Sequence, residues 1–169
     1  MDTGRNQNKL SVYLETSFIS MLTSWPSSLP STLGMQTISR QWWDFKRYEY
    51  DLFISDSVRM EMSNGDSGAV ERRLRSVEGI PVLKISGTTK DLSKEILIRH
   101  LLPVDQLEDV IHVVCAAVNR MDYVLTWNCK HIANEHIFRS ISAFLSEYDL
   151  KCPCLTTPFY LMGDADASR

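Results

Sequence analysis

The sequence is poor in residues that could cross-link a fold or anchor it in a membrane. It has four cysteines in 169 residues, and only one residue separates Cys152 from Cys154, so we expect free thiols throughout. No run approaches the roughly 20 apolar residues that cross a bilayer. The segment Met1 to Lys9 is polar and lacks the apolar centre of a signal peptide. These absences predict a cytoplasmic protein without a membrane segment.

Several catalytic motifs and an excess of positive charge are also missing. There is no glycine-rich phosphate loop, no GxSxG turn and no HExxH, the usual marks of nucleotide hydrolysis, ester hydrolysis and zinc proteolysis. Cys129, His131, Cys152 and Cys154 lack the regular paired spacing of a structural zinc site. A net charge of −3 and a pI near 5.8 argue against coating nucleic acid by bulk electrostatics. A protein of this charge that acts on RNA needs a local basic strip or bound cations.

The residues that are present fit one globular domain. With 44% hydrophobic and 23% charged residues, we expect a single domain over residues 1–169, with its core from about 10 to 162. Short segments rich in β-branched and aromatic residues are typical of strands, and most end in polar residues, as buried parallel strands do. The predicted strands are Leu10–Leu14, Asp51–Ile54, Pro81–Ile85, Tyr123–Leu125 and, at an edge, Leu155–Thr156.

Helical patterns alternate with these strands. The predicted helices run from Ser31 or Thr32 to Tyr48, from Ser67 to Val77, from Thr88 to Leu101, from the Asp105–Glu108 capping pattern to Val118, and from Asn134 to Tyr148. Alternating strands and helices imply right-handed crossovers. The sequence therefore predicts a three-layer α-β-α fold around a central, mostly parallel sheet of four to five strands.

Three acidic residues from distant parts of the chain are expected at one edge of this sheet. Glu15 follows the first strand, Glu61 follows the second by about a turn and a half, and Asp109 opens the apolar helix before the fourth. Clustered carboxylates repel each other unless a cation neutralises them. Oxygen ligands without cysteine or paired histidines favour Mg²⁺ or Mn²⁺, which can promote phosphodiester hydrolysis.

Each acid also has a simpler interpretation. Glu15 can cap a short helix that begins near Ser17, Glu61 can be a solvated helix residue, and Asp109 can complement a helix dipole. For each acid alone, these roles are at least as common as metal binding. The joint placement favours the metal site, and Asp109 contributes most because the residues after it are almost wholly apolar.

Four motifs stand in chain order: Val12–Ser17 (VYLETS), Phe53–Glu61 (FISDSVRME), Asp109–Ala117 (DVIHVVCAA) and Asp122–Asn134 (DYVLTWNCKHIAN). They resemble those of PIN-domain proteins, and most of all the toxin ribonucleases of bacterial toxin-antitoxin pairs. The resemblance covers about Leu10 to Met162. It implies a metal-dependent endoribonuclease in which Glu15, Glu61 and Asp109 hold Mg²⁺ or Mn²⁺. Asn128 stands where many relatives have a fourth acid, and it is a candidate to ligate weakly or to orient water.

One residue departs from the family pattern. Glu15 stands where the family has aspartate, and the extra methylene moves the carboxylate by about one C–C bond, whereas Mg²⁺ demands near-ideal geometry. Two functions therefore stay open. The first is an RNA-cleaving toxin that is blocked by a small antitoxin. For this toxin, a homodimer also stays open. The alternative is a PIN-fold module that binds RNA or a protein partner without cutting.

Several other residues are weaker candidates. Ser17 can assist a metal ligand or cap a helix, and His112 can touch RNA phosphate, although a histidine on an apolar helix is more often structural. Arg59 and Lys130, with Arg40 and Arg47, are candidate phosphate contacts, although a solvated face is their commoner role. Of Trp25, Trp42 and Trp43, we expect one to be exposed for binding.

Overall fold

A computed structural model describes residues 9–99, 101, 106–128 and 135–163. Its sheet has five strands in the order β3-β2-β1-β4-β5, and every neighbouring pair is parallel. The strands are β1 (Leu10–Leu14), β2 (Tyr50–Ser55), β3 (Val82–Leu83), β4 (Tyr123–Leu125) and β5 (Cys154–Thr156). The predicted parallel sheet is confirmed, with the fifth strand at an edge.

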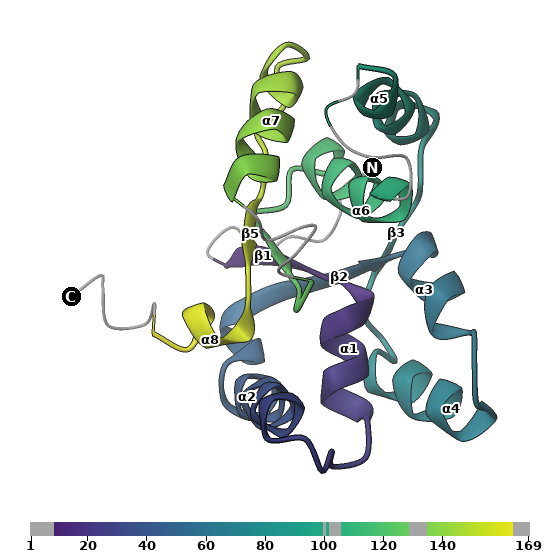
Figure 1. Cartoon of the computed structure of the whole chain (residues 1–169), viewed down its shortest axis with the longest axis vertical. Coiled ribbons are helices and arrows are strands. Elements are labelled where there is room, and N and C mark those ends of the chain that lie inside the picture. The colour runs from purple at the N-terminus through teal and green to yellow at the C-terminus, as the bar shows by residue number, and fades with distance from the viewer. Residues whose placement is uncertain (1–8, 100, 102–105, 129–134, 164–169) are drawn as a thin grey trace.

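Helices cover both faces of the sheet (Figure 1). Helices α1 (Thr16–Thr23), α2 (Pro30–Phe45), α4 (Ser67–Ser76) and α8 (Pro158–Leu161) lie on one side, and α5 (Gly87–Ile98), α6 (Leu107–Val118) and α7 (Glu135–Ser146) lie on the other. A 3₁₀ turn, η1 (Arg47–Glu49), precedes β2, and the short α3 (Asp56–Met62) follows it. This arrangement is the three-layer fold that the alternation of elements predicts.

Each face of the sheet has its own apolar core. On the α1–α2 side, Phe18 and Trp42 are fully buried and meet edge to face at 5.5 Å between ring centroids. On the α5–α6–α7 side, Ile96, Val114 and Leu145 are fully buried in a second cluster. Helix α6 contributes to both clusters, which explains why it is apolar on nearly every face.

Polar side chains at strand ends begin three of the helices. Glu15 follows β1, Ser55 is the last residue of β2 and Ser86 comes shortly after β3, and their side chains accept hydrogen bonds from the first-turn amides of α1, α3 and α5. The register Leu14↔Leu125 and the Glu15 N–H to Leu125 C=O bond of 3.0 Å align the ends of β1 and β4. These carboxyl ends of the strands form the side of the sheet at which the three acids were expected.

Several boundaries differ from the sequence prediction. Helix α2 begins at Pro30, a favoured first helical residue, and ends at Phe45 because a 3₁₀ turn takes over. Strand β3 is limited to Val82–Leu83, and the four-residue α8 was not predicted. Asp105 and Asn134, which were expected to begin helices, lie outside the described residues. Among the described residues, no helix has the length and apolar character to span a bilayer.

Candidate active site

Glu15 lies buried at the end of β1 with its carboxylate held by three donors. Its side chain is 5% exposed. Oε1 accepts from the Ser17 amide at 3.0 Å, and Oε2 accepts from the Thr126 hydroxyl at 2.7 Å and from the Ser17 hydroxyl. The reach of glutamate therefore matches donors on both α1 and the segment after β4. Because Oε1 accepts only one of these bonds, it retains an acceptor site.

The same contacts tie the segment after β4 to the start of α1. The Trp127 amide donates to the Ser17 hydroxyl at 2.8 Å, and the Asn128 amide donates to the Thr126 hydroxyl at 2.9 Å. Ser17 thus supports Glu15 and the loop at once, which goes beyond the simple helix-capping role. Thr126 was not singled out from the sequence, although its position directly after a predicted strand was the available signal.

Glu61 projects from α3 toward the same edge. Its Oε1 lies 2.9 Å from His112 Nε2 and accepts from the Ser57 hydroxyl at 3.3 Å, while Oε2 accepts from the Thr16 hydroxyl. Burial alone would raise the pKa of Glu61, but the hydrogen bonds from His112, Thr16 and Ser57 hold it below its usual value. Glu61 is therefore an ionised carboxylate at neutral pH, and its interpretation as a solvated helix residue does not fit these contacts.

His112 occupies the centre of the group. It is 1% exposed, and its Nδ1 lies 2.7 Å from the Tyr13 hydroxyl. Burial lowers the pKa of His112, but the hydrogen bond to Glu61 and the charges of Glu61, Glu15 and Asp109 raise it above its usual value overall. Its burial leaves little surface for the RNA phosphate contact considered from the sequence. The helical spacing from Asp109 was the signal that placed it on this face.

Glu15, Glu61 and His112 form a cluster that could hold a metal ion. One carboxylate oxygen from each glutamate and one ring nitrogen of His112 lie within 4.8 Å of one another. Asp109 lies outside this group, and its Oδ1 accepts from the Asn128 side-chain amide at 2.9 Å. Its charge still raises the pKa of His112, so it contributes to the field of the cluster.

The carboxylate oxygens of this cluster fit a hard divalent cation. Within the described residues, Glu15 Oε1 and Glu61 Oε2 each accept one hydrogen bond, so both have a free acceptor site beside the cluster. Two buried or half-buried carboxylates facing one edge are the oxygen ligands that Mg²⁺ and Mn²⁺ prefer.

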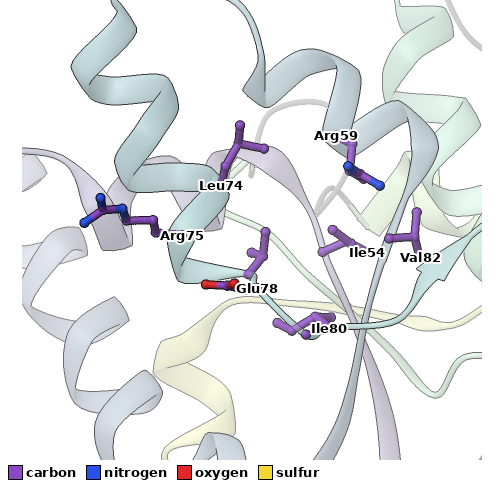
Figure 2. Close-up of a pocket in the computed structure, with 9 residues that line it drawn as sticks. Ile54, Arg59, Leu74, Arg75, Glu78, Ile80 and Val82 are labelled. Atoms are coloured by element: carbon purple, nitrogen blue, oxygen red, sulfur yellow. The ribbon is translucent and has the colours of Figure 1, made fainter.

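The arginine candidates lie away from this cluster. Arg59 is exposed on α3 and lines a hollow of about 570 Å³ with Leu74, Arg75, Glu78 and residues of β2 and β3 (Figure 2). Arg40 donates to the Ser24 carbonyl at 2.6 Å, and Arg47 stacks over Trp43 at 4.5 Å, so both have structural contacts. Lys130 lies outside the described residues. Trp25 is the exposed tryptophan, at 74%, with the Arg72 guanidinium over its ring.

Comparison with known proteins supports the fold. No protein-family model and no curated protein matches the sequence. Among solved structures, VapC20 of Mycobacterium tuberculosis, a toxin that cleaves the sarcin-ricin loop, is 16% identical with a TM-score of 0.54, covering 70% of this chain and 91% of VapC20. VapBC2 of Rickettsia felis, bound to a DNA fragment from its promoter, is 10% identical with a TM-score of 0.50, covering 88% of this chain and 98% of that chain. The chain thus has the PIN-type fold of the VapC toxins.

Proposed function

We propose that this chain is a divalent-metal-dependent endoribonuclease and the toxin of a type II toxin-antitoxin pair. The observation that carries the proposal is the pair of carboxylates, Glu15 and Glu61, that meet beside His112 at the strand ends of a VapC-like fold. The proposal treats residues 1–169 as one PIN-type domain that acts on RNA in the cytoplasm.

Glu15, Glu61 and Asp109 are the residues that would hold Mg²⁺ or Mn²⁺. When bound, the ion would supply Lewis-acid polarisation of the phosphate and a more acidic water. Ser17, Thr126 and Thr16 keep the two glutamates aimed at the edge by hydrogen bonds. Asn128 orients Asp109 through its amide, which is a positioning role in place of the fourth acid of many relatives.

The antitoxin partner is proposed from the resemblance and from VapBC2. Exposed apolar side chains on α1–α4 and their connections, including Trp25 and Met60 at 74% and 68% exposure, provide surface for a small protein. The product of a short reading frame next to the gene is the partner to test by co-purification.

The test of the enzymatic proposal is Asp109→Asn, compared with Glu108→Gln as a matched control. Glu108 is the exposed neighbour of Asp109 in the same helical turn, so its substitution removes one charge without touching the cluster. We expect Asp109→Asn to lower single-turnover cleavage of structured RNAs by roughly a hundredfold or more, because losing a well-placed charge costs a few kcal/mol of transition-state stabilisation. Glu108→Gln should cleave like the parent. Equal cleavage by parent and Asp109→Asn would remove Asp109 from the mechanism.

The non-cutting binding module is the alternative outcome. It becomes the better function if the parent cleaves no RNA of a mixed structured set in either metal but still binds one of them. Binding is measured by fluorescence anisotropy under the same conditions.

A further inference from the structure

A buried chain of hydrogen bonds leads from the start of α3 to Glu61. The Ser55 hydroxyl lies 2.7 Å from the Tyr13 hydroxyl, which lies 2.7 Å from His112 Nδ1, and His112 Nε2 lies 2.9 Å from Glu61 Oε1. Ser55 and Tyr13 are fully buried and His112 is 1% exposed, so water has no access to the three linking groups. The chain joins β2, β1, α6 and α3.

The direction of this chain follows from its first member. The Val58 amide donates to Ser55 Oγ at 3.2 Å, so Ser55 is already an acceptor in the α3 cap. Among the described residues, the Tyr13 oxygen is the remaining acceptor within reach of the Ser55 hydroxyl proton. The Tyr13 proton is then left for His112 Nδ1. A reversed chain would leave the Ser55 hydroxyl proton buried without an acceptor, which is unfavourable.

The direction of the hydrogen bonds fixes the tautomer of a neutral His112. With Nδ1 accepting from Tyr13, a neutral His112 must carry its proton on Nε2. That proton points at Glu61 Oε1.

We propose that His112 is a positioning residue whose Nε2–H, set by Tyr13 and Ser55, holds Glu61 Oε1 and leaves Glu61 Oε2 as the oxygen that faces a cation. His112 is then a donor to a metal ligand and is not itself a ligand. This keeps the site an all-oxygen site, which favours Mg²⁺ or Mn²⁺ over zinc. The catalytic consequence rests on the proposed function, but the hydrogen-bond direction does not.

The first experiment reads the tautomer directly. Long-range ¹H–¹⁵N spectra of the full chain, ¹⁵N-labelled on histidine, distinguish a protonated Nε2 from a protonated Nδ1, and His112→Gln identifies the His112 signals by their loss. We expect His112 to have Nε2 protonated and Nδ1 accepting, in EDTA and after Mg²⁺ is added. A protonated Nδ1 in either condition, whether Nε2 is bare or also protonated, would overturn the proposal. This readout needs no nuclease activity, so it stands even if the chain cuts no RNA.

The second experiment measures what positioning does for the ion. Tyr13→Phe removes the hydroxyl and keeps the ring, and we expect it to weaken Mn²⁺ binding by about 10- to 100-fold, the range typical for partners of metal ligands. Tyr160→Phe, an exposed tyrosine on α8, is the matched control and should bind like the parent. His112→Gln, which keeps an N–H near the Nε2 position, should bind more tightly than His112→Leu.

The Mn²⁺ arm also separates a positioning residue from a ligand. Pulsed electron paramagnetic resonance detects ¹⁴N coupling when an imidazole nitrogen binds Mn²⁺ directly, and we expect none from His112. A ¹⁴N coupling that disappears in His112→Gln, or unchanged affinity in Tyr13→Phe, would contradict the positioning role. If the parent binds no divalent ion, the proposed function is wrong. The tautomer spectrum would still decide the direction of the hydrogen bonds from Ser55 to Glu61.

Discussion

Glu15 illustrates how a residue that departs from a family pattern can be matched by its surroundings. Its carboxylate accepts from the Ser17 amide, the Ser17 hydroxyl and the Thr126 hydroxyl. An aspartate at this position would draw the carboxylate back by about one C–C bond and away from these donors. The sequence alone left open whether the longer side chain weakens the site, whereas the contacts indicate that the site is built around glutamate.

We therefore expect Glu15→Asp to lower Mg²⁺ affinity and cleavage. The loss of one or two hydrogen bonds to a charged group costs about 1.5 to 3 kcal/mol each, which corresponds to at least a tenfold effect. Isothermal titration with Mg²⁺ and single-turnover cleavage, for parent and variant in parallel, provide the measurement. Faster cleavage by Glu15→Asp would instead mean that the shorter aspartate of the family pattern suits the ion better.

The cysteines give a second prediction at the scale of single residues. Burial raises the pKa of both Cys115 and Cys152 to about 12, while Cys154 is exposed. Since the thiolate is the nucleophile, at pH 8 only about one buried thiol in 10⁴ is reactive at a given moment. We expect iodoacetamide to label Cys154 in the folded chain and to spare Cys115 and Cys152, as read by tandem mass spectrometry. Denatured chain is the control and should be labelled at all four cysteines of the sequence, and rapid labelling of Cys115 in the folded chain would contradict its burial.

At the scale of elements, the link between α3 and α6 depends on a hydrogen bond between Glu61 and His112. Glu61 on α3 and His112 on α6 meet at 2.9 Å, and Tyr13 on β1 supports the histidine from a position 99 residues earlier. The sequence placed both helices at one edge but did not pair these two side chains. Helical periodicity gives the face of each helix, and the crossover geometry decides which residues on those faces touch.

This pair predicts a pH dependence of stability in metal-free protein. The pKa of Glu61 in the folded chain lies below its usual 4.5. Its contribution to the free energy of unfolding is therefore fully present above about pH 4.5 and is lost as the pH falls through the lowered folded-state pKa. We expect Glu61→Gln to be less stable than the parent near pH 6, with the difference shrinking toward pH 3. Urea denaturation in EDTA at several pH values measures it, with Glu108→Gln as control, and a constant difference across this range would contradict the lowered pKa of Glu61.

At the scale of the whole molecule, two apolar cores hold the sheet edge in place. The clusters around Trp42 and around Ile96 and Val114 fix α1, α2, α5 and α6 against the two faces. The acid cluster therefore sits on a rigid frame, which limits how far like charges can move apart. A bound cation would relieve their repulsion in the folded state alone.

Metal should consequently stabilise the whole fold. At a free concentration 100-fold above Kd, a ligand specific for the folded state adds about 2.7 kcal/mol. For a chain of this size that is a rise in Tm of about 5 to 10 °C. Melting curves in EDTA, Ca²⁺, Mg²⁺ and Mn²⁺ test it, and Asp109→Asn should show a smaller rise. Identical curves in EDTA and in millimolar Mg²⁺ and Mn²⁺ would count against a metal site.

The sequence by itself determined the order along the chain of the strands and of the longer helices, and the acids near the strand ends, because period-two and helical patterns record which face of each element is buried. It also brought Glu15 and Glu61 to one edge, as parallel strands require.

Only the tertiary structure decided that His112, and not Asp109, completes the tightest group with Glu15 and Glu61, and that Asp109 pairs with Asn128. It also decided that Thr126 and Ser17 serve Glu15. These contacts join residues far apart in the chain. Their distances depend on strand register and on how α6 crosses the sheet, and local patterns of residues do not encode either of these.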